Sequence, residues 1–310
     1  MVSGIYALIQ PDHLAPGKLY PALLACTRHA VSVGALRRIE TEQRFIADAG
    51  VNFLVRAVSN LQRKRDDKQQ IRKQERASGH TFNPFLPPEQ DLTVGGISDT
   101  HIAVLNKFNV LDHHLLIVTR EFEPQERLLT RADLEAWWLA LKEIDGLGFY
   151  NGGPQAGASQ RHKHLQLVTL PLAPGLSQVP MASLFPNRIE PSTLVSIPRL
   201  PFRHAFCRLP EGLWQDPPRA ADRAFQLYLG MLEHCGLRTR AQDGFPLQVA
   251  PYNLLIQRHW MLLVPRLKEH WEQISVNALG YAGSLFVRDS VELKRVTEQG
   301  PMQVLMKVSL

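Results

Sequence analysis

Two histidines and a glutamine alternate along one short segment that directly follows a glycine-rich loop. Residues 162–170 alternate in polarity and then become apolar, which predicts a strand that enters a core. Residues two apart share one face of a strand, so His162, His164 and Gln166 should line one side. The opposite side should carry Lys163, Leu165 and Leu167. Residues 151–160 are small and polar, so their backbone can approach an anion closely. Imidazoles beside such a loop suit a phosphate next to a nucleophile.

Other functions fit the two histidines taken alone. With 12 histidines in 310 residues, an H-x-H pair carries little weight by itself. The pair could be half of a metal site, or simply a polar face. The loop is not a Walker A motif, because Ala158 and Ser159 stand where Lys and Ser or Thr are required. The signal therefore lies in the sum of the loop, the H-x-H-x-Q pattern and the apolar strand.

The segment YNGGPQAGASQRHKHLQ, residues 150–166, resembles the signature of diadenosine tetraphosphate phosphorylases, also called ATP adenylyltransferases. These enzymes belong to the histidine-triad superfamily, in the branch where Gln replaces the third histidine. Other segments resemble the family in the expected order, namely residues 83–87, 104–110, 114–119, 252–255 and 260–266. The resemblance covers most of the chain. It implies phosphorolytic cleavage of diadenosine 5',5'''-tetraphosphate to ADP and ATP through an adenylyl-histidine intermediate.

The resemblance also implies roles for individual residues. His164 would be the nucleophile, a choice that spacing leaves open, and His162 would position it or pack beneath it. Gln166 would hydrogen-bond the adenylyl phosphate. Because an amide cannot titrate as an acid, Gln166 favours transfer to phosphate over hydrolysis by water. The loop backbone, with Asn151, Gly153 and Ser159, would cradle the phosphoryl oxygens. Gln160 would contact the leaving phosphates, and Gly157 is a further substrate-binding candidate in this loop.

Four further candidate contacts lie outside this motif. Asn106 stands where superfamily members place a polar residue on the ribose hydroxyls. Arg56 and Lys64 lie near the point where basic residues face the substrate phosphates in the family. Arg266 could also reach phosphate. The ordinary alternative for such Arg and Lys side chains is solvation at the surface.

The expected ligands are an adenine dinucleotide polyphosphate and inorganic phosphate. The net charge of +6 fits anionic ligands, although solubility alone would also explain it. No nucleic-acid-binding signature is evident, so nucleic acid is not an expected partner. We expect no covalently bound cofactor. Mg²⁺ is a candidate companion of the polyphosphate, since no acidic cluster argues for a protein-held ion. The oligomeric state is left open.

Composition favours a cytoplasmic enzyme. A chain of 310 residues that is 45% hydrophobic can bury a substantial core. No apolar run approaches the roughly 20 residues that span a bilayer, so no membrane partner is expected. The first residues lack the pattern of a signal peptide. Three widely spaced cysteines form neither a disulfide framework nor a C-x-x-C metal site.

We expect an α+β fold, with a histidine-triad-like antiparallel sheet, flanking helices and two related halves. Residues 1–172 would form the catalytic half, residues 173–200 a proline-rich connection, and residues 201–310 a C-terminal half without H-x-H. Helices are predicted over 17–30, 130–144 and 219–235, the second opened by a capping box at Thr130 and Asp133. Strands are predicted over 51–56, 101–108, 114–119 and 162–170, and a hairpin over 247–266. His113 and His114 are expected in a turn.

Two other functions stay open at this stage. A metal-dependent nucleotide hydrolase would use His162 and His164 as ligands, and it would be sensitive to chelators. A non-catalytic protein that binds adenosine polyphosphates would leave them intact.

Overall fold

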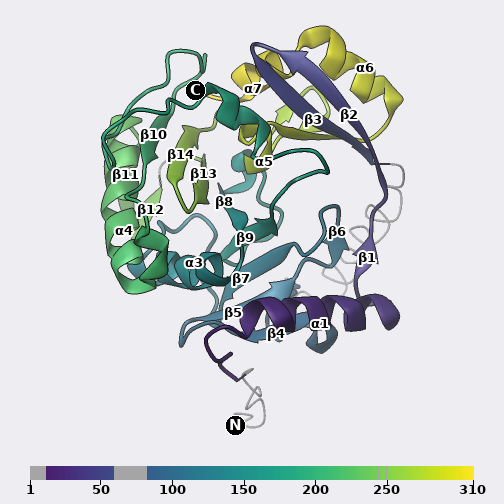
Figure 1. Ribbon diagram of the computed structural model, residues 1–310, viewed down its shortest axis with the longest axis vertical. Helices are drawn as coiled ribbons and strands as arrows, with labels where there is room; N and C mark the ends of the chain where they lie inside the picture. The colour runs from purple at the N-terminus through teal and green to yellow at the C-terminus, as the bar shows by residue number, and fades with distance from the viewer. Residues whose placement is uncertain (1–11, 59–81, 243–244, 249) are drawn as a thin grey trace.

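The computed structural model describes residues 12–58, 82–242, 245–248 and 250–310. Its central element is a sheet with the strand order β10-β14-β13-β8-β9-β7-β5-β4, in which every pair is antiparallel (Figure 1). These strands are β4 (Thr93–Gly96), β5 (His101–Leu105), β7 (Leu115–Thr119), β8 (Gly146–Gly152), β9 (His164–Thr169), β10 (Ala205–Arg208), β13 (Tyr252–Gln257) and β14 (Trp260–Pro265). The predicted α+β fold with an antiparallel sheet and flanking helices is confirmed.

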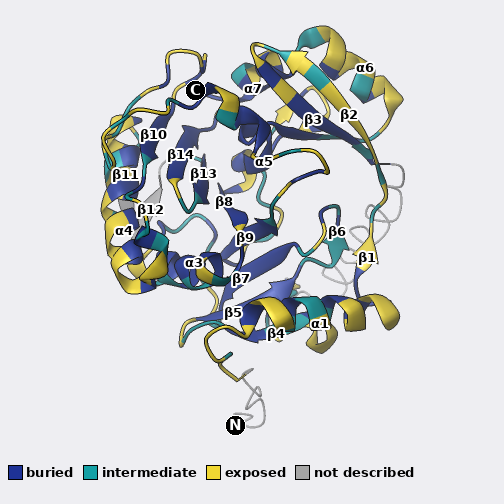
Figure 2. Cartoon of the chain, viewed as in Figure 1, coloured by how far each residue is buried: buried dark blue, intermediate teal, exposed yellow. Residues whose placement is uncertain are grey.

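Side-chain alternation gives this sheet two apolar faces. In β13, Leu254 and Ile256 belong to one buried cluster, whereas Leu255 belongs to the other. The first cluster is covered by the helices α1 (Leu19–Ser32), α3 (Arg131–Glu143) and α4 (Pro217–His234). The second is covered by α5 (Ala278–Tyr281), α6 (Ser290–Gln299), α7 (Pro301–Val308) and a small sheet of β2 (Thr41–Asp48), β3 (Val51–Val58) and β17 (Ser284–Val287). Figure 2 shows the central strands buried between these layers, with exposed residues on the outer sides of the helices.

The two predicted halves share the central sheet. Strand β13 pairs with β8, so residues 201–310 continue the sheet that residues 1–172 begin. A second link is the parallel pairing of β17 with β3. Residues 173–200 pack on the second face, where Leu184 and Ile197 are buried. The division into two halves and a connection stays a prediction.

Helices and strands largely follow the sequence pattern. The predicted helices appear as α1, α3 and α4, and the predicted strands as β3, β5, β7 and β9. The hairpin predicted over 247–266 is wrong at its beginning, because the hairpin is β13–β14 and starts at Tyr252. Pro251 explains the difference, since it lacks the N–H that a continuous strand would need. The strand before it pairs elsewhere, in the hairpin of β11 (Thr239–Gln242) and β12 (Phe245–Gln248).

Two short strand pairs lie outside these sheets. They are the parallel pair of β1 (Arg37–Arg38) with β6 (Phe108–Asn109) and the antiparallel pair of β15 (His270–Trp271) with β16 (Ile274–Ser275). Within the described ranges, no helix combines the length and apolar character that crossing a membrane requires.

The predicted capping box opens α3. The Thr130 hydroxyl accepts a hydrogen bond from the Asp133 N–H at 3.2 Å, and the Asp133 carboxylate accepts one from the Thr130 N–H at 2.6 Å. This box satisfies N–H groups that a helix start leaves without intrahelical partners. It also holds Asp133 under the sheet, where its carboxylate is buried.

Replacing the capping threonine should destabilise the fold. We expect Thr130→Ala to lower the free energy of unfolding by about 1–2 kcal/mol, since the cap to the Asp133 N–H is lost. Urea denaturation followed by circular dichroism measures the change. Thr297→Ala is the matched control: this exposed hydroxyl only donates to the Leu293 carbonyl within α6, so its loss should change stability by less than about 0.5 kcal/mol. Equal effects of the two substitutions would contradict the capping role.

Candidate active site

Strand β9 lies between β8 and β7 and carries the H-x-H-x-Q pattern. Leu165 and Leu167 join the cluster under the helices, whereas Val168 joins the opposite cluster. His164 and Gln166 therefore lie on the face opposite Leu165 and Leu167, as the alternation predicted. Both side chains are buried, with exposed fractions of 4% and 7%. Function on this strand has to use groups that water barely reaches.

The ring of His164 is held in one tautomer by its own strand. Nδ1 lies 2.8 Å from the backbone oxygen of His162, so Nδ1 carries the proton and donates it. Burial, more than any other influence, lowers the pKa of His164 to about 4. Among the described residues, none forms a hydrogen bond with Nε2. The imidazole is therefore neutral at pH 7, with a lone pair on Nε2.

Both ring nitrogens of His162 are bound to protein groups. Nε2 lies 2.8 Å from the Thr119 carbonyl oxygen and 2.9 Å from the Thr119 hydroxyl, and Nδ1 lies 3.0 Å from the Asn83 amide nitrogen. Nε2–H thus donates to Thr119, and Nδ1 accepts from Asn83. Burial lowers the pKa of His162 as well. His162 therefore differs from His164, because protein groups occupy both of its ring nitrogens.

The segment around Asn83 forms a wall beside the two imidazoles. The Phe85 ring lies 5.6 Å from the His162 ring and 5.7 Å from the His164 ring, centroid to centroid. Its N–H donates to the Asn83 side-chain oxygen, which fixes the turn. The resemblance drew attention to this segment but not to Asn83 itself. Phe85 contributes to the exclusion of water from His164.

Gln166 is oriented by two successive hydrogen bonds that run through His114 to Asn106. His114 Nε2 lies 3.0 Å from the Gln166 side-chain oxygen, and His114 Nδ1 lies 3.0 Å from the Asn106 amide nitrogen. The consistent assignment has Asn106 donating to Nδ1 and Nε2–H donating to Gln166. The NH₂ group of Gln166 then has no hydrogen-bond partner among the described residues. His113 is in a turn as predicted, with φ 56°, but the buried ring of His114 belongs to the site.

Several N–H groups of the loop after β8 donate hydrogen bonds to carbonyl oxygens of the same segment. Gly153 N–H donates to Asn151 O, Ala156 and Ala158 donate to Gly153 O, and Gly157 donates to Pro154 O. Gly153 and Gly157 have φ of 98° and 93°, a region that favours glycine. A Cβ at Gly157 would lie 2.8 Å from Asn277 Cβ, so this glycine permits close approach of another chain segment.

The N–H groups available to an anion lie at the end of this loop. Among the described residues, those of Ser159, Gln160 and Arg161 have no hydrogen-bond partner. The Ser159 side chain is exposed and that of Gln160 is half-buried. Ser159 and Gln160 stand just before His162 in the chain, so their N–H groups lie next to the histidine segment.

Asn151 and Arg266 support the loop through buried hydrogen bonds. The Asn151 side-chain oxygen accepts from the Asn253 amide at 2.8 Å and from the Ala278 N–H at 2.9 Å. The Arg266 guanidinium donates to Asn253, to Ala156 O and to three other backbone carbonyls, so all its donors are engaged internally. The structure thus places both residues in a buried scaffold.

The other predicted basic residues lie elsewhere. Arg56 is buried in β3, where its guanidinium donates to the Ser284 hydroxyl and to the Leu172 carbonyl. Burial lowers its pKa to about 10. These contacts join β3 to β17 and to the segment after β9, and neither is to the imidazoles. Lys64 lies outside the described residues.

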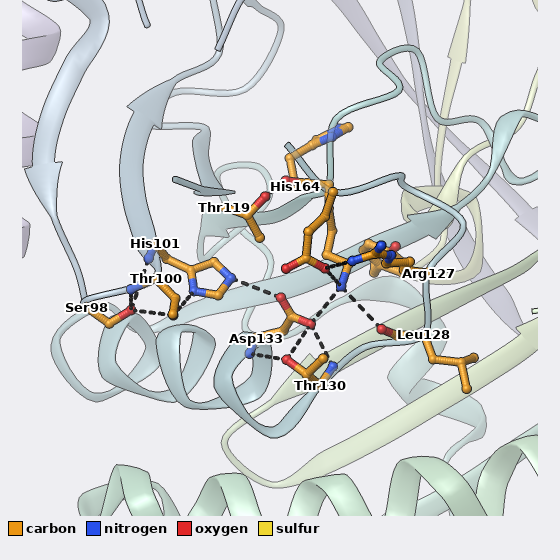
Figure 3. A network of polar contacts seen from close by, with 12 residues as sticks. Ser98, Thr100, His101, Thr119, Arg127, Leu128, Thr130, Asp133 and His164 are labelled. Carbon is orange, nitrogen blue, oxygen red and sulfur yellow. Dashed lines mark hydrogen bonds and ion pairs between the residues drawn. The ribbon is translucent and has the colours of Figure 1, made fainter. Parts of the chain in front are cut away.

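An ionic cluster anchors β9 from the helix side. Lys163 is fully buried, and its Nζ lies 2.8 Å from Glu123, 3.1 Å from Asp133 and 3.2 Å from the Leu128 carbonyl. His101 Nε2 contacts the second Asp133 oxygen at 2.9 Å. Figure 3 shows Asp133 between His101 and the capping residue Thr130, with His164 above. The residue between the two histidines thus fixes the strand that presents them.

The described residues contain no group of three or more His, Cys, Asp and Glu side chains placed to hold a metal ion. A site that used both His162 and His164 would need ring nitrogens that are already bound. Three of their four nitrogens contact protein groups, as described above.

Comparison with known proteins agrees with this architecture. Residues 9–187 match the Ap4A phosphorylase N-terminal domain, and residues 198–310 match the ATP adenylyltransferase C-terminal domain. The chain is 29% identical over 252 residues to diadenosine 5',5'''-P1,P4-tetraphosphate phosphorylase 2 of Saccharomyces cerevisiae, covering 70% of this chain and 72% of that protein. It is 28% identical over 239 residues to protein APA1 of the same yeast, with the same coverage.

Solved structures show the same fold. The crystal structure of yeast Ap4A phosphorylase Apa2 matches with a TM-score of 0.74 at 23% identity, over 97% of this chain and 96% of that one. The structure of Apa2 in complex with Ap4A matches with a TM-score of 0.70 at 22% identity, over 97% and 99%. Together with the domain matches, the fold and the site define an enzyme of the nucleotidyltransferase type. The chain belongs to the Ap4A phosphorylase and ATP adenylyltransferase family.

Stability in acid should depend on Asp133. Burial alone would raise its pKa, but the hydrogen bond with His101 and the charge of Lys163 outweigh burial and lower the pKa to about 2. The unfolded value is about 3.9, so the ionised carboxylate stabilises the fold fully above about pH 4, and this stabilisation is lost as pH falls through 2. We expect Asp133→Asn to lower the free energy of unfolding at pH 6 by about 2–3 kcal/mol and to flatten its decline between pH 4 and 2.

Denaturant titrations across this pH range measure both effects. Asp145→Asn is the control, because Asp145 is exposed and should change stability by less than about 0.5 kcal/mol. An Asp133→Asn variant that keeps the wild-type acid dependence would show that Asp133 is not the titrating group.

Proposed function

We propose that this chain cleaves diadenosine 5',5'''-tetraphosphate by phosphorolysis, yielding ADP and ATP. Family membership supports the proposal, as does the yeast relative, whose name states this phosphorylase activity. The solved complexes of Apa2 with Ap4A and with AMP support an adenine nucleotide as ligand.

One observation carries the mechanism: His164 is a buried, neutral imidazole whose Nδ1–H is fixed and whose Nε2 has no partner among the described residues. A nucleophilic nitrogen must be unprotonated, and the lowered pKa ensures this without a separate base. His162 lacks a comparable nitrogen, because Thr119 and Asn83 engage both sides of its ring. We therefore propose His164 Nε2 as the nucleophile and His162 as its support.

The reaction follows in two displacements. Nε2 of His164 attacks the α-phosphorus of one adenylyl group, the P–O bond to the next phosphate breaks, and ATP leaves. An oxygen of inorganic phosphate then attacks the adenylyl-histidine, the P–N bond breaks, and ADP leaves with His164 restored. A covalent intermediate divides one difficult displacement into two easier ones. ATP is a stable anion when it leaves, so the neutral amide Gln166 suffices where a titrating acid would otherwise be needed.

Charge that develops on the phosphoryl oxygens needs fixed donors. We propose that these are the Gln166 NH₂ group, oriented through His114, and the N–H groups of Ser159 and Gln160 at the end of the loop. Gly153 and Gly157 shape that loop, and Asn151 supports it from beneath. Because its amide nitrogen contacts His114, Asn106 would meet the ribose through its side-chain oxygen.

The remaining ligand contacts are also proposals. The internal contacts of Arg56 and Arg266 favour scaffold roles for both, whereas Lys64 stays a candidate for the phosphates. Mg²⁺ would arrive with the polyphosphate, bound to its oxygens. We propose that the chain is a histidine-triad relative that acts in the cytoplasm, where its three free cysteines would stay reduced.

Product analysis tests the proposed reaction. The purified protein is incubated with diadenosine tetraphosphate, with and without inorganic phosphate, and nucleotides are separated by chromatography. We expect multiple turnovers to ADP and ATP only with phosphate, and a loss of roughly 10⁴-fold or more in kcat for His164→Ala, since the nucleophile is removed. His162→Ala should retain more activity than His164→Ala, because His164 Nδ1 bonds to the backbone of residue 162 and not to its side chain.

Other products would decide against phosphorolysis. Turnover to AMP and ATP without phosphate would identify a hydrolase. If that turnover stopped with a chelator and returned with Zn²⁺, a metal-dependent hydrolase would replace the proposal. Intact substrate in every reaction would leave a binding protein.

The first displacement should also have an unusual pH dependence. Because the pKa of His164 lies near 4, the imidazole loses its proton, and becomes nucleophilic, as pH rises through about 4. The rate of single-turnover ATP release, measured without phosphate, should therefore be nearly constant from pH 8 to 5.5 and fall below that. Circular dichroism at each pH confirms that the protein stays folded. A midpoint near 6.5, the ordinary value for histidine, would contradict the buried neutral nucleophile.

A further inference from the structure

Strands β8 and β9 stop pairing just where the catalytic histidine begins. The last pair in their register is Phe149 with Gln166. Two steps further, the same register would place Asn151 opposite His164. Beyond Phe149, β8 pairs only with β13, through Gly152, and it no longer pairs with β9. The backbone groups of this would-be pair therefore need other partners.

The side chain of Gln125 takes the place of the missing strand contacts. Its oxygen accepts from the His164 N–H at 2.9 Å, and its NH₂ group donates to Asn151 O at 2.9 Å and to His164 O at 3.2 Å. All three hydrogen-bonding contacts are to main-chain groups of the two separated strands. The carboxamide therefore acts as one peptide unit of an inserted strand. Gln125 is almost fully buried, with 1% exposed.

The backbone of Gln125 is held from both sides as well. Its N–H donates to Arg161 O at 2.8 Å, and its carbonyl accepts from the Tyr150 hydroxyl. Tyr150 belongs to β8, whereas Arg161 immediately precedes the catalytic pair. Gln125 is thus held by β8 and by the segment that leads into β9, through both its main chain and its side chain.

We infer that Gln125 is a positioning residue that sets the main-chain geometry of His164, an inference that rests on the proposed function. The Nδ1–H of His164 reaches the carbonyl oxygen of His162 only while the backbone between them keeps its conformation. Gln125 holds the peptide groups on both sides of the His164 Cα and fixes their separation from Asn151, where the loop begins. It thereby sets the position of Nε2 relative to the loop donors without touching the substrate.

The inference predicts a loss in kcat without a matching change in KM. Gln125→Met keeps the length and apolar volume of the side chain but removes all three hydrogen bonds. We expect kcat to fall by roughly 10- to 100-fold, as for small misplacements of a reacting group, with KM within about twofold. Gln125→Glu is the second variant, because it keeps an acceptor for the His164 N–H and loses both donated bonds. It should also lower kcat. Gln226→Met, at an exposed glutamine on α4, should leave both parameters unchanged.

A readout without turnover separates this inference from the proposed function. In ¹⁵N-histidine-labelled protein, the His164 ring signals, identified by their absence in His164→Ala, should show a single Nδ1–H tautomer in the wild type. In Gln125→Met they should show a mixture. If the wild type fails to cleave the dinucleotide, the proposed function fails, and the tautomer result alone decides on the positioning role.

Three results would overturn the inference. One is a folded Gln125→Met variant with kcat within threefold of the wild type. Another is a loss of kcat that the unfolded fraction at the assay temperature, measured by circular dichroism, fully explains. The last is an unchanged His164 tautomer in both Gln125 variants.

Discussion

The hydrogen bond from Nδ1 of His164 to the carbonyl of His162 is the constraint on which the rest of the site depends. It decides which ring nitrogen carries the proton and therefore which one has the free lone pair that the proposed mechanism requires. Burial then keeps the ring uncharged, with a pKa of about 4. Tautomer and charge are set by two different causes, one local to the strand and one produced by the packing around it. The proposed nucleophile thus has its tautomer and charge set before any substrate binds.

The two faces of β9 carry different kinds of side chains. One face presents His164 and Gln166, and each has its orientation fixed by a neighbouring group. The other face buries Lys163 among Glu123 and Asp133 and also carries Leu165 and Leu167. A buried ammonium is costly unless it is well paired, so this cluster tolerates little displacement of the strand. We infer that charge on the helix side gives the catalytic side its rigidity.

Features that depend on local spacing could be predicted from the sequence. The period of two along residues 162–167 correctly separated the histidines from Lys163, and Thr130 with Asp133 correctly marked the start of α3. Features that depend on strand order could not. His114 meets Gln166 only because β7 and β9 are neighbours, and Gln125 is placed by two strands that separate. Neither residue has a periodic or compositional signal of its own.

Burial was the other property that the sequence did not reveal. Arg56 and Arg266 have the side chain expected of a phosphate ligand, yet both donate to protein groups in the interior. The charge of an arginine is read from its type, but its partner depends on which segments meet around it. The same applies to Lys163, whose acidic partners are 30 and 40 residues away in the chain. The resemblance to a known family suggests His164 as the nucleophile, and the buried, neutral ring is the physical argument for that proposal.

Trapping of the intermediate would test the central claim most directly. The protein is mixed with diadenosine tetraphosphate without phosphate, quenched under alkaline conditions that preserve the P–N bond, digested and analysed by mass spectrometry and ³¹P NMR. We predict one adenylyl group per active site, attached to Nε2 of His164 and discharged as ADP when phosphate is added before the quench. An adenylyl group on His162, attachment through Nδ1, or turnover with phosphate but no trapped adduct would contradict the assignment of His164 Nε2 as the nucleophile.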